Sequence, residues 1–189
     1  MTQESEIRVF TIGHSTRSLE AFIGLLAAHN VECLMDVRTV PRSRRNPQFN
    51  RESLPSALSA AGVGYVHESA LGGLRKTRAD SPNTGWRNAS FRGYADYMQT
   101  PEFAQGVARL VEIAARKRTA IMCAEAVPWR CHRSLIADAL VVRGIAVEHI
   151  LSGERTMPHT LTGFAVVENE RIRYPGPDQA SGDLFGDSD

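Results

Sequence analysis

The sequence predicts an α/β domain of three layers, in which helices cover both faces of a mainly parallel sheet. Short apolar runs with strand character alternate with segments whose apolar residues recur at helical spacing. Such an alternation requires crossover connections, and these make neighbouring strands parallel. The chain has 189 residues, 42% of them hydrophobic and 23% charged, which is enough to bury one core. We therefore expect a single domain over residues 1–174.

The first half of the chain alternates strands at residues 8–13, 31–38 and 64–68 with two helices. The first helix, near residues 19–30, follows a group of hydroxyl side chains that can cap it and has apolar residues at helical spacing. The second helix would begin after an Asn50 cap and end before Gly62, although Pro55 falls within it.

The second half opens with residues 69–93, which lack a clear period and are rich in Gly, Arg, Ser and Asn. A connection of this length is usually a lid or a binding loop. The remaining elements are a helix at 100–116, a strand at 120–123, a helix from about 132 to 143, a strand at 146–151 and a hairpin of 164–167 with 171–174. Residues 175–189 are polar and acidic, and we expect them to be a disordered tail.

Polar side chains stand where the predicted strands end, which indicates a binding site. They are His14 and Ser15 after the first strand, Asp36 and Arg38 at the second, and Cys123 and Glu125 at the fourth. The carboxyl ends of parallel strands share one edge of a sheet, and open α/β sheets bind ligands at that edge. Helix amino termini at this edge favour an anion.

An arginine-rich segment follows the second strand. It contains Arg38, Arg42, Arg44, Arg45 and Arg51, together with Asn46. One interpretation is an anion clamp formed mainly by Arg38, Arg44, Asn46 and Arg133, since guanidinium groups match phosphate, sulfate or carboxylate. The other is a solvated basic loop that pairs with surface acids. Of 22 basic residues only Lys76 and Lys117 are lysines, which favours planar anion contacts but can equally reflect genomic base composition.

The segment from residue 123 to residue 133 combines thiols, an imidazole and guanidinium groups. Cys123 is either a nucleophile, activated by nearby cationic groups and a helix amino terminus, or a small residue that completes a buried strand. Cys131 is a rival nucleophile or a resolving thiol, and His132 is a general base or a helix-capping residue. Glu125 can orient a ligand or pair with Arg133. We expect the Cys123 thiol to react in preference to Cys33, which lies within a strand.

Metal binding is a third interpretation of these cysteines, with His14 as a further ligand. Adjacent Cys and His side chains seldom reach one metal, and the short cysteine spacing of structural zinc sites is missing. We therefore expect neither a metal nor a cofactor. Three scattered cysteines indicate a reducing cytoplasm, and no apolar stretch is long enough to span a bilayer.

Four ordered motifs resemble the family catalogued as domain of unknown function 488. They are Thr11-Ile-Gly-His-Ser-Thr, Asp36-Val-Arg-x-x-Pro-x-Ser-x-x-Asn-Pro-x-Phe, Leu71-Gly-Gly and Cys123-Ala-Glu-x(5)-Cys-His-Arg. The resemblance runs from about residue 9 to residue 174 and implies a bacterial or archaeal single-domain α/β protein without an assigned activity. The chain is also similar, more remotely, to rhodaneses and cysteine phosphatases, in which a strand ends in Cys and an Arg opens the next helix around an anion-binding loop. Nine residues separate Cys123 from Arg133, a longer loop than in those families.

We expect a small cytoplasmic enzyme that acts on an anionic substrate, which would be phosphorylated, a nucleotide or sulfur-bearing. It would be a Cys-dependent hydrolase or transferase. The alternative is a non-catalytic protein that binds a nucleotide or nucleic acid through the arginines and through stacking on Trp86, Phe91, Tyr94 and Tyr97. A third class is a protein-interaction module. The net charge of +1 by itself gives no reason to expect polyanion binding.

Overall fold

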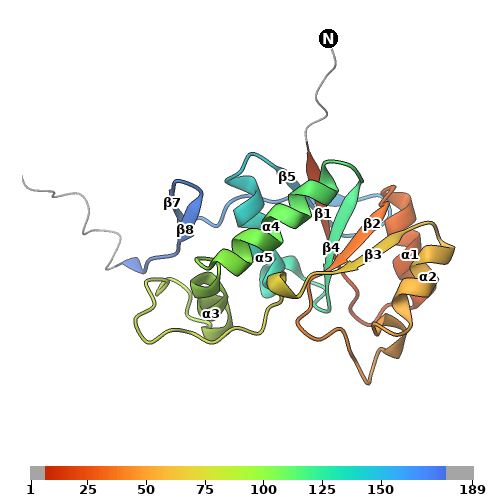
Figure 1. Cartoon of the computed structure of the whole chain (residues 1–189), viewed down its shortest axis with the longest axis horizontal. Helices are drawn as coiled ribbons and strands as arrows, with labels where there is room; N and C mark the ends of the chain where they lie inside the picture. Colours follow the sequence, from red (N-terminus) through yellow and green to blue (C-terminus); the bar gives the residue numbers. More distant parts are fainter. Residues whose placement is uncertain (1–6, 178–189) are drawn as a thin grey trace, which may run out of the picture.

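The computed structural model describes residues 7–177, which form a six-stranded sheet between two layers of helices (Figure 1). The strand order is β3-β2-β4-β1-β5-β6, and every neighbouring pair is parallel except β5 and β6. The strands are β1 Arg8–Gly13, β2 Cys33–Asp36, β3 Gly64–His67, β4 Thr119–Cys123, β5 Ala146–Ile150 and β6 Thr156–Pro158. The predicted α/β class with a mainly parallel sheet is confirmed.

Helices cover both faces of the sheet. They are α1 Leu19–Ala28, α2 Leu54–Ala60, α3 Ala89–Tyr97, α4 Pro101–Ala114 and α5 Arg133–Val141. In Figure 1, α1 and α2 lie on one side of the strands and α4 and α5 lie on the other. Each face has its own core because successive residues of a strand point to opposite faces: Phe10 packs with Phe22 on one side, and Val9 packs with Leu135 on the other.

Several helix ends follow the local signals in the sequence. Ser18 Oγ accepts a hydrogen bond from the Ala21 amide at the start of α1. Gly62 and Gly144 have positive φ angles of 76° and 74°, beyond the ends of α2 and α5. The expected start of the second helix at Asn50 is wrong. Helix α2 begins at Leu54 because proline is tolerated only in the first helical turn, and a 3-10 helix at Pro47–Phe49 precedes it.

Three further elements were not expected from the sequence. Residues 69–93 contain a 3-10 helix at Ser69–Leu71 and the start of α3, while β6 adds an antiparallel edge strand. On helix α3 the carboxylate of Asp96 is buried, where it accepts hydrogen bonds from the Asn83 side chain and the Arg78 amide. Tertiary contacts therefore stabilise this helix more than its own sequence pattern does.

The C-terminal hairpin is present, as β7 Val166–Glu168 and β8 Arg171–Arg173. Asn169 and Glu170 both have positive φ in its turn, the conformation that two-residue hairpins favour. Most of the expected acidic tail, residues 178–189, lies outside the described residues. At its beginning, the Gly176 amide donates a hydrogen bond to Thr84 Oγ1, so the chain still contacts the domain there.

The parallel strands β1 and β4 are neighbours at the centre of the sheet, and the connections that follow them run toward opposite ends of the strand order. The chain leaves β1 for α1 on one face and leaves β4 for α5 on the opposite face (Figure 1). A crevice opens at the carboxyl ends of such strands. Gly13 ends β1 beside Cys123, and a Cβ atom there would lie 1.9 Å from the Glu125 carbonyl oxygen. Only glycine therefore lets the loop after β4 pass this close to β1.

Candidate active site

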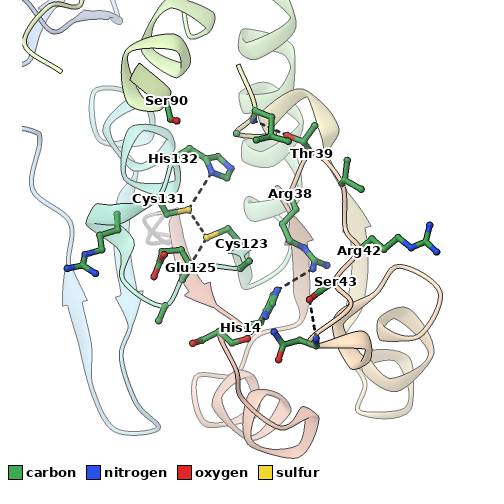
Figure 2. Close-up of a pocket in the computed structure, with 18 of the residues that line it drawn as sticks. His14, Arg38, Thr39, Arg42, Ser43, Ser90, Cys123, Glu125, Cys131 and His132 are labelled. Carbon is green, nitrogen blue, oxygen red and sulfur yellow. Dashed lines mark hydrogen bonds between the residues drawn. The ribbon is translucent and has the colours of Figure 1, made fainter. Parts of the chain in front are cut away.

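A pocket of about 680 Å³ lies at the carboxyl edge of the sheet (Figure 2). Its walls come from the ends of β1, β2 and β4, from residues 73–74 and 90–91, and from the loop before α5. The pocket brings together most of the predicted site residues: His14, Ser15, Arg38, Asn46, Cys123, Glu125, Cys131 and His132. Residues 69–93 therefore border the site. Asp36, Arg44 and Arg133 do not line the pocket.

Two thiols and an imidazole form one wall. The Sγ atoms of Cys123 and Cys131 are 2.6 Å apart, and Cys131 Sγ is 3.4 Å from His132 Nδ1. His132 Nε2 lies 2.8 Å from the Val37 carbonyl oxygen, which can only accept a hydrogen bond. The hydrogen of a neutral His132 is therefore on Nε2, and Nδ1 is an acceptor directed at Cys131. This is the geometry of a thiol with its general base.

The electrostatic surroundings of the two thiols differ. Burial raises the pKa of Cys123, and its contact with Cys131 raises that pKa further. Burial also acts to raise the pKa of Cys131. The hydrogen bonds of Cys131 with Cys123 and His132, and the charge of Arg133, outweigh burial and hold its pKa well below the ordinary value. These surroundings favour negative charge on Cys131 over Cys123, and Cys131 also precedes the positive end of the α5 dipole.

Gly73 fixes the position of the His132 ring. A Cβ atom on Gly73 would lie 2.6 Å from His132 Nδ1 and 2.9 Å from two ring carbons. On another side, the Tyr94 ring lies 5.1 Å from the imidazole, centroid to centroid, and its hydroxyl donates to the Leu71 carbonyl. The Leu71-Gly-Gly motif thus provides the space that the imidazole occupies beside Cys131.

The wall across from the thiols contains Arg38 and His14 (Figure 2). Asp36 holds Arg38 through two side-chain hydrogen bonds of 2.9 and 2.6 Å, and the Phe49 carbonyl accepts a third. Nη1 of Arg38 lies 3.3 Å from His14 Nε2. Because burial lowers the pKa of His14 and its Nδ1–H donates to the Ser15 carbonyl, the imidazole is neutral and its Nε2 accepts from Arg38. Asp36 therefore orients the Arg38 side chain and, because it does not line the pocket, is not placed to contact a ligand there.

Further arginines lie at the pocket mouth. Arg42, Arg45 and Arg130 are exposed and line the pocket, and within residues 7–177 none of them forms an ion pair. In Figure 2 the Arg42 side chain points away from the thiols, so its charge acts at the entrance. Arg44 is exposed but outside the pocket. These arginines are not neutralised by surface acids of the described part.

Arg133 is not directed into the pocket. It is 1% exposed, and its guanidinium donates to the Glu125 carbonyl at 2.7 Å and to Thr11 Oγ1 at 3.1 Å. Neither the Glu125 carboxylate nor Asp36 pairs with it. Arg133 thus holds the loop after β4 through the Glu125 carbonyl, on the interior side of that loop. From there its positive charge acts to lower the pKa of both thiols.

A buried chain of hydrogen bonds leads from Thr11 to Asp138. Thr11 Oγ1 lies 2.7 Å from His149 Nδ1, His149 Nε2 lies 3.0 Å from His159 Nδ1, and His159 Nε2 lies 2.8 Å from Asp138 Oδ1. With both imidazoles neutral, every group donates toward Asp138 and accepts from the side of Arg133. The chain therefore joins the Arg133 guanidinium, whose buried Nε has no hydrogen-bond partner within the described residues, to the Asp138 carboxylate.

The Asp138 end of this chain is equally well satisfied. The carboxylate also accepts hydrogen bonds from the Tyr174 hydroxyl at 2.7 Å and from the Thr162 amide at 3.0 Å. Asp138 and Tyr174 are fully buried. The sequence pattern gave no signal for this network, since its members come from separate elements and only Thr11 lies within a motif.

The model of the domain of unknown function DUF488 matches residues 18–140, which is more than half of the chain. The chain belongs to this family. The matched segment is shorter than the resemblance expected over residues 9–174. No curated protein and no solved structure matches the chain.

This DUF488 chain brings all four sequence motifs to the pocket. The first supplies Gly13 and His14, the second Arg38, the third Gly73, and the last both thiols and His132. Sequence reasoning did not assign Thr39, Ser43 and Ser90, which also line the pocket. The glycine pair of the third motif was the one signal that pointed to Gly73.

The described residues contain no group of three or more His, Cys, Asp or Glu side chains arranged to hold a metal ion. Both ring nitrogens of His14 have hydrogen-bond partners, Ser15 and Arg38. His14, the further ligand of the metal interpretation, lies on the wall across from the thiols (Figure 2).

Proposed function

We propose that this protein is a thiol-dependent enzyme that acts on an anionic small molecule, with Cys131 as the nucleophile. The observation that carries the proposal is the contact between Cys131 Sγ and His132 Nδ1 inside the pocket, with His132 Nε2 held by a backbone carbonyl. A cysteine is activated in this way when an oriented base and nearby positive charge favour its thiolate. The geometry favours Cys131 over Cys123, which sequence reasoning had placed first.

Each group on this wall has a part in the reaction. His132 takes the proton of Cys131 and returns it to the leaving group, which is general acid–base catalysis. Cys123 keeps its proton and donates its S–H to the thiolate, and Arg133 stabilises the negative charge from the interior. The attack would occur at an electrophilic phosphorus, carbon or sulfur atom, which makes the enzyme a hydrolase or a transferase.

The pocket supports a small anionic substrate. Its volume lies within the range of about 300–1,000 Å³ typical of small-molecule sites. Arg38 offers charge opposite the thiols, and Arg45 and Arg130 offer it at the mouth. The exposed side chains of Val40 and Leu74 add apolar surface to the lining. A phosphorylated, nucleotide or sulfur-bearing metabolite would suit this combination.

The alternative of nucleic-acid binding by aromatic stacking has less support. Trp86 packs against Phe91, Phe164 and Tyr174 at centroid distances of 4.8, 4.9 and 5.4 Å. Tyr94 is fully buried. These rings anchor the domain, and they do not form an open platform for bases.

A cytoplasmic location is part of the same proposal. The chemistry requires reduced thiols, and Cys33, Cys123 and Cys131 are all free. Within residues 7–177, no helix is both long enough and apolar enough to cross a membrane.

Alkylation kinetics test the proposal. Iodoacetamide rates should be measured against pH for the wild type and for Cys131→Ser, Cys123→Ser and Cys33→Ser. We expect fast labelling near neutral pH that disappears only in Cys131→Ser. Slow labelling of all three thiols, with an ordinary thiol titration, would leave the cysteines as packing residues and overturn the proposal.

The anionic reagent iodoacetate tests the charge of the pocket. We expect the ratio of iodoacetate to iodoacetamide rates to fall in Arg45→Gln, because Arg45 lines the pocket, and to fall also at high salt. Arg44→Gln is the matched control, since Arg44 is the exposed neighbour outside the pocket. Equal ratios in the wild type and both variants would refute anion selection by these arginines.

A further inference from the structure

The separation of the two pocket thiols is close to a bonding distance. Their sulfur atoms are 2.6 Å apart, while a disulfide bond measures about 2.03–2.05 Å. A movement of about half an ångström would therefore join them. Cys123 ends β4 and Cys131 lies eight residues later, so the bond would close only the short loop that contains Pro128–Arg130.

We propose that Cys123 and Cys131 form a reversible disulfide and that this dithiol reduces hydroperoxides in the pocket. The inference rests on the proposed function in one respect, namely that Cys131 is the reactive thiolate. It adds a resolving role for Cys123 and a second class of substrate, a peroxide, which nucleophilic catalysis alone would not require.

The first step oxidises Cys131. Its thiolate attacks the terminal oxygen of the hydroperoxide, an S–O bond forms and the O–O bond breaks. The alkoxide or hydroxide that leaves takes the proton from the His132 imidazolium and departs as an alcohol or water. Cys131 is then a sulfenic acid, and two electrons have passed from sulfur to the peroxide.

The second step forms the disulfide. The Cys123 sulfur attacks the Cys131 sulfur, the S–O bond breaks, and hydroxide leaves with the Cys123 proton as water. The sum is one hydroperoxide and two thiols converted to one alcohol, one water and one disulfide. A low-molecular-weight dithiol restores both cysteines by thiol–disulfide exchange.

Accessibility favours this order of events. Cys131 is 7% exposed and Cys123 is 2% exposed, and both line the pocket. A reagent as small as a hydroperoxide fits in the pocket beside Cys131. Cys33 cannot take part, because it begins β2 at the opposite edge of the sheet. Arg133 and His132 place positive charge beside the sulfur that reacts first.

The disulfide would also switch the proposed enzyme off. Oxidation removes the Cys131 thiolate, and His132 Nδ1 loses the charged sulfur that it faces. The same pair then connects the activity of the site to the redox state of its surroundings.

Peroxide titration of the reduced, full-length protein tests this inference. We expect hydrogen peroxide and an organic hydroperoxide each to remove both pocket thiols, with a mass loss of two hydrogen atoms that dithiothreitol reverses. Cys123→Ser should instead stop at a sulfenic acid that dimedone traps, Cys131→Ser should react slowly, and Cys33→Ser should match the wild type.

The outcomes separate this inference from the proposed function. If Cys131 alkylates rapidly in Cys123→Ser but peroxide yields no internal disulfide in the wild type, the redox inference fails and the nucleophile stands. If peroxide forms the disulfide while Cys131 shows an ordinary thiol titration, the nucleophile proposal fails, and so does the order of attack argued above. A disulfide that forms only between chains, or that includes Cys33, would also overturn the inference.

Discussion

Gly73→Ala is the most direct perturbation of the proposed catalytic pair, because it leaves the cysteines and the histidine in the sequence. The new methyl group would lie 2.6 Å from His132 Nδ1, well inside the distance that real contacts allow. The imidazole cannot simply move aside, since Tyr94 packs against it and its Nε2–H is hydrogen-bonded to Val37. We therefore expect His132 to leave its place beside Cys131.

The size of the effect follows from the contacts that are lost. Overpacking of a buried site costs about 1–3 kcal/mol, which for a chain of this length lowers Tm by roughly 2–12 °C. A hydrogen bond to a charged group contributes about 1.5–3 kcal/mol, so loss of the contact between Cys131 and His132 should slow alkylation at neutral pH roughly ten- to a hundredfold.

Thermal unfolding and iodoacetamide kinetics measure these two effects on the same samples. Gly24→Ala is the matched control: Gly24 lies in α1 with open space around its Cα, so alanine should stabilise the helix by about 0.5–1 kcal/mol and leave the thiols unchanged. An unaltered alkylation profile for Gly73→Ala, at any Tm, would refute the role assigned to His132.

Three further predictions concern stability. Asp138→Asn should cost roughly 3–5 kcal/mol, seen as a lower Tm, whereas Tyr174→Phe should cost only about 1 kcal/mol; equal losses would contradict the charged network. Burial, then the nearby His159 and Arg133 side chains, lower the pKa of His149 to about 4. The unfolded chain therefore binds its proton first, and stability should fall by about 3 kcal/mol as the pH drops from 6.5 to 4. Urea unfolding of His149→Gln should show a flatter dependence in that window, and an unchanged slope would exclude His149 as the cause. The hydrogen bond from Arg109 lowers the pKa of Glu68. The stability that this contributes is present above the unfolded pKa and is lost as the pH falls through the folded value. Arg109→Gln should therefore lower Tm at pH 7, and its difference from the wild type should shrink as the pH falls below the unfolded pKa.

Patterns within the sequence were sufficient to predict the sheet and most of the helices. Each strand of the parallel core is a short apolar run, and caps such as Ser18 and stops such as Gly144 act on residues a few positions away. Local rules failed where distant contacts decide the structure. Helix α3 is held by hydrogen bonds between Asp96 and the preceding loop, and β6 forms by antiparallel pairing with the edge of β5.

Some of the residues that form the site were also predictable. Polar residues at the carboxyl ends of parallel strands share one edge of the sheet, which predicts that His14, Arg38 and Cys123 lie together. All three line the pocket. The sequence could not tell which arginine faces a ligand. Arg133 belongs to the same motif as the thiols but is buried beneath the loop, because Thr11 and the Glu125 carbonyl take up its donors.

The α/β class, the family and the edge of the sheet at which the chemistry-bearing residues gather are predictable from the sequence, because they depend on period, spacing and strand direction. The folded chain, and no local pattern, places the imidazole beside Cys131 rather than Cys123. That choice depends on a sulfur-to-nitrogen distance of 3.4 Å, on the carbonyl of Val37 that orients His132, and on the space that Gly73 leaves. The pKa of a buried group is fixed by atoms within a few ångströms, and here those atoms come from segments about sixty and ninety-five residues away in the chain.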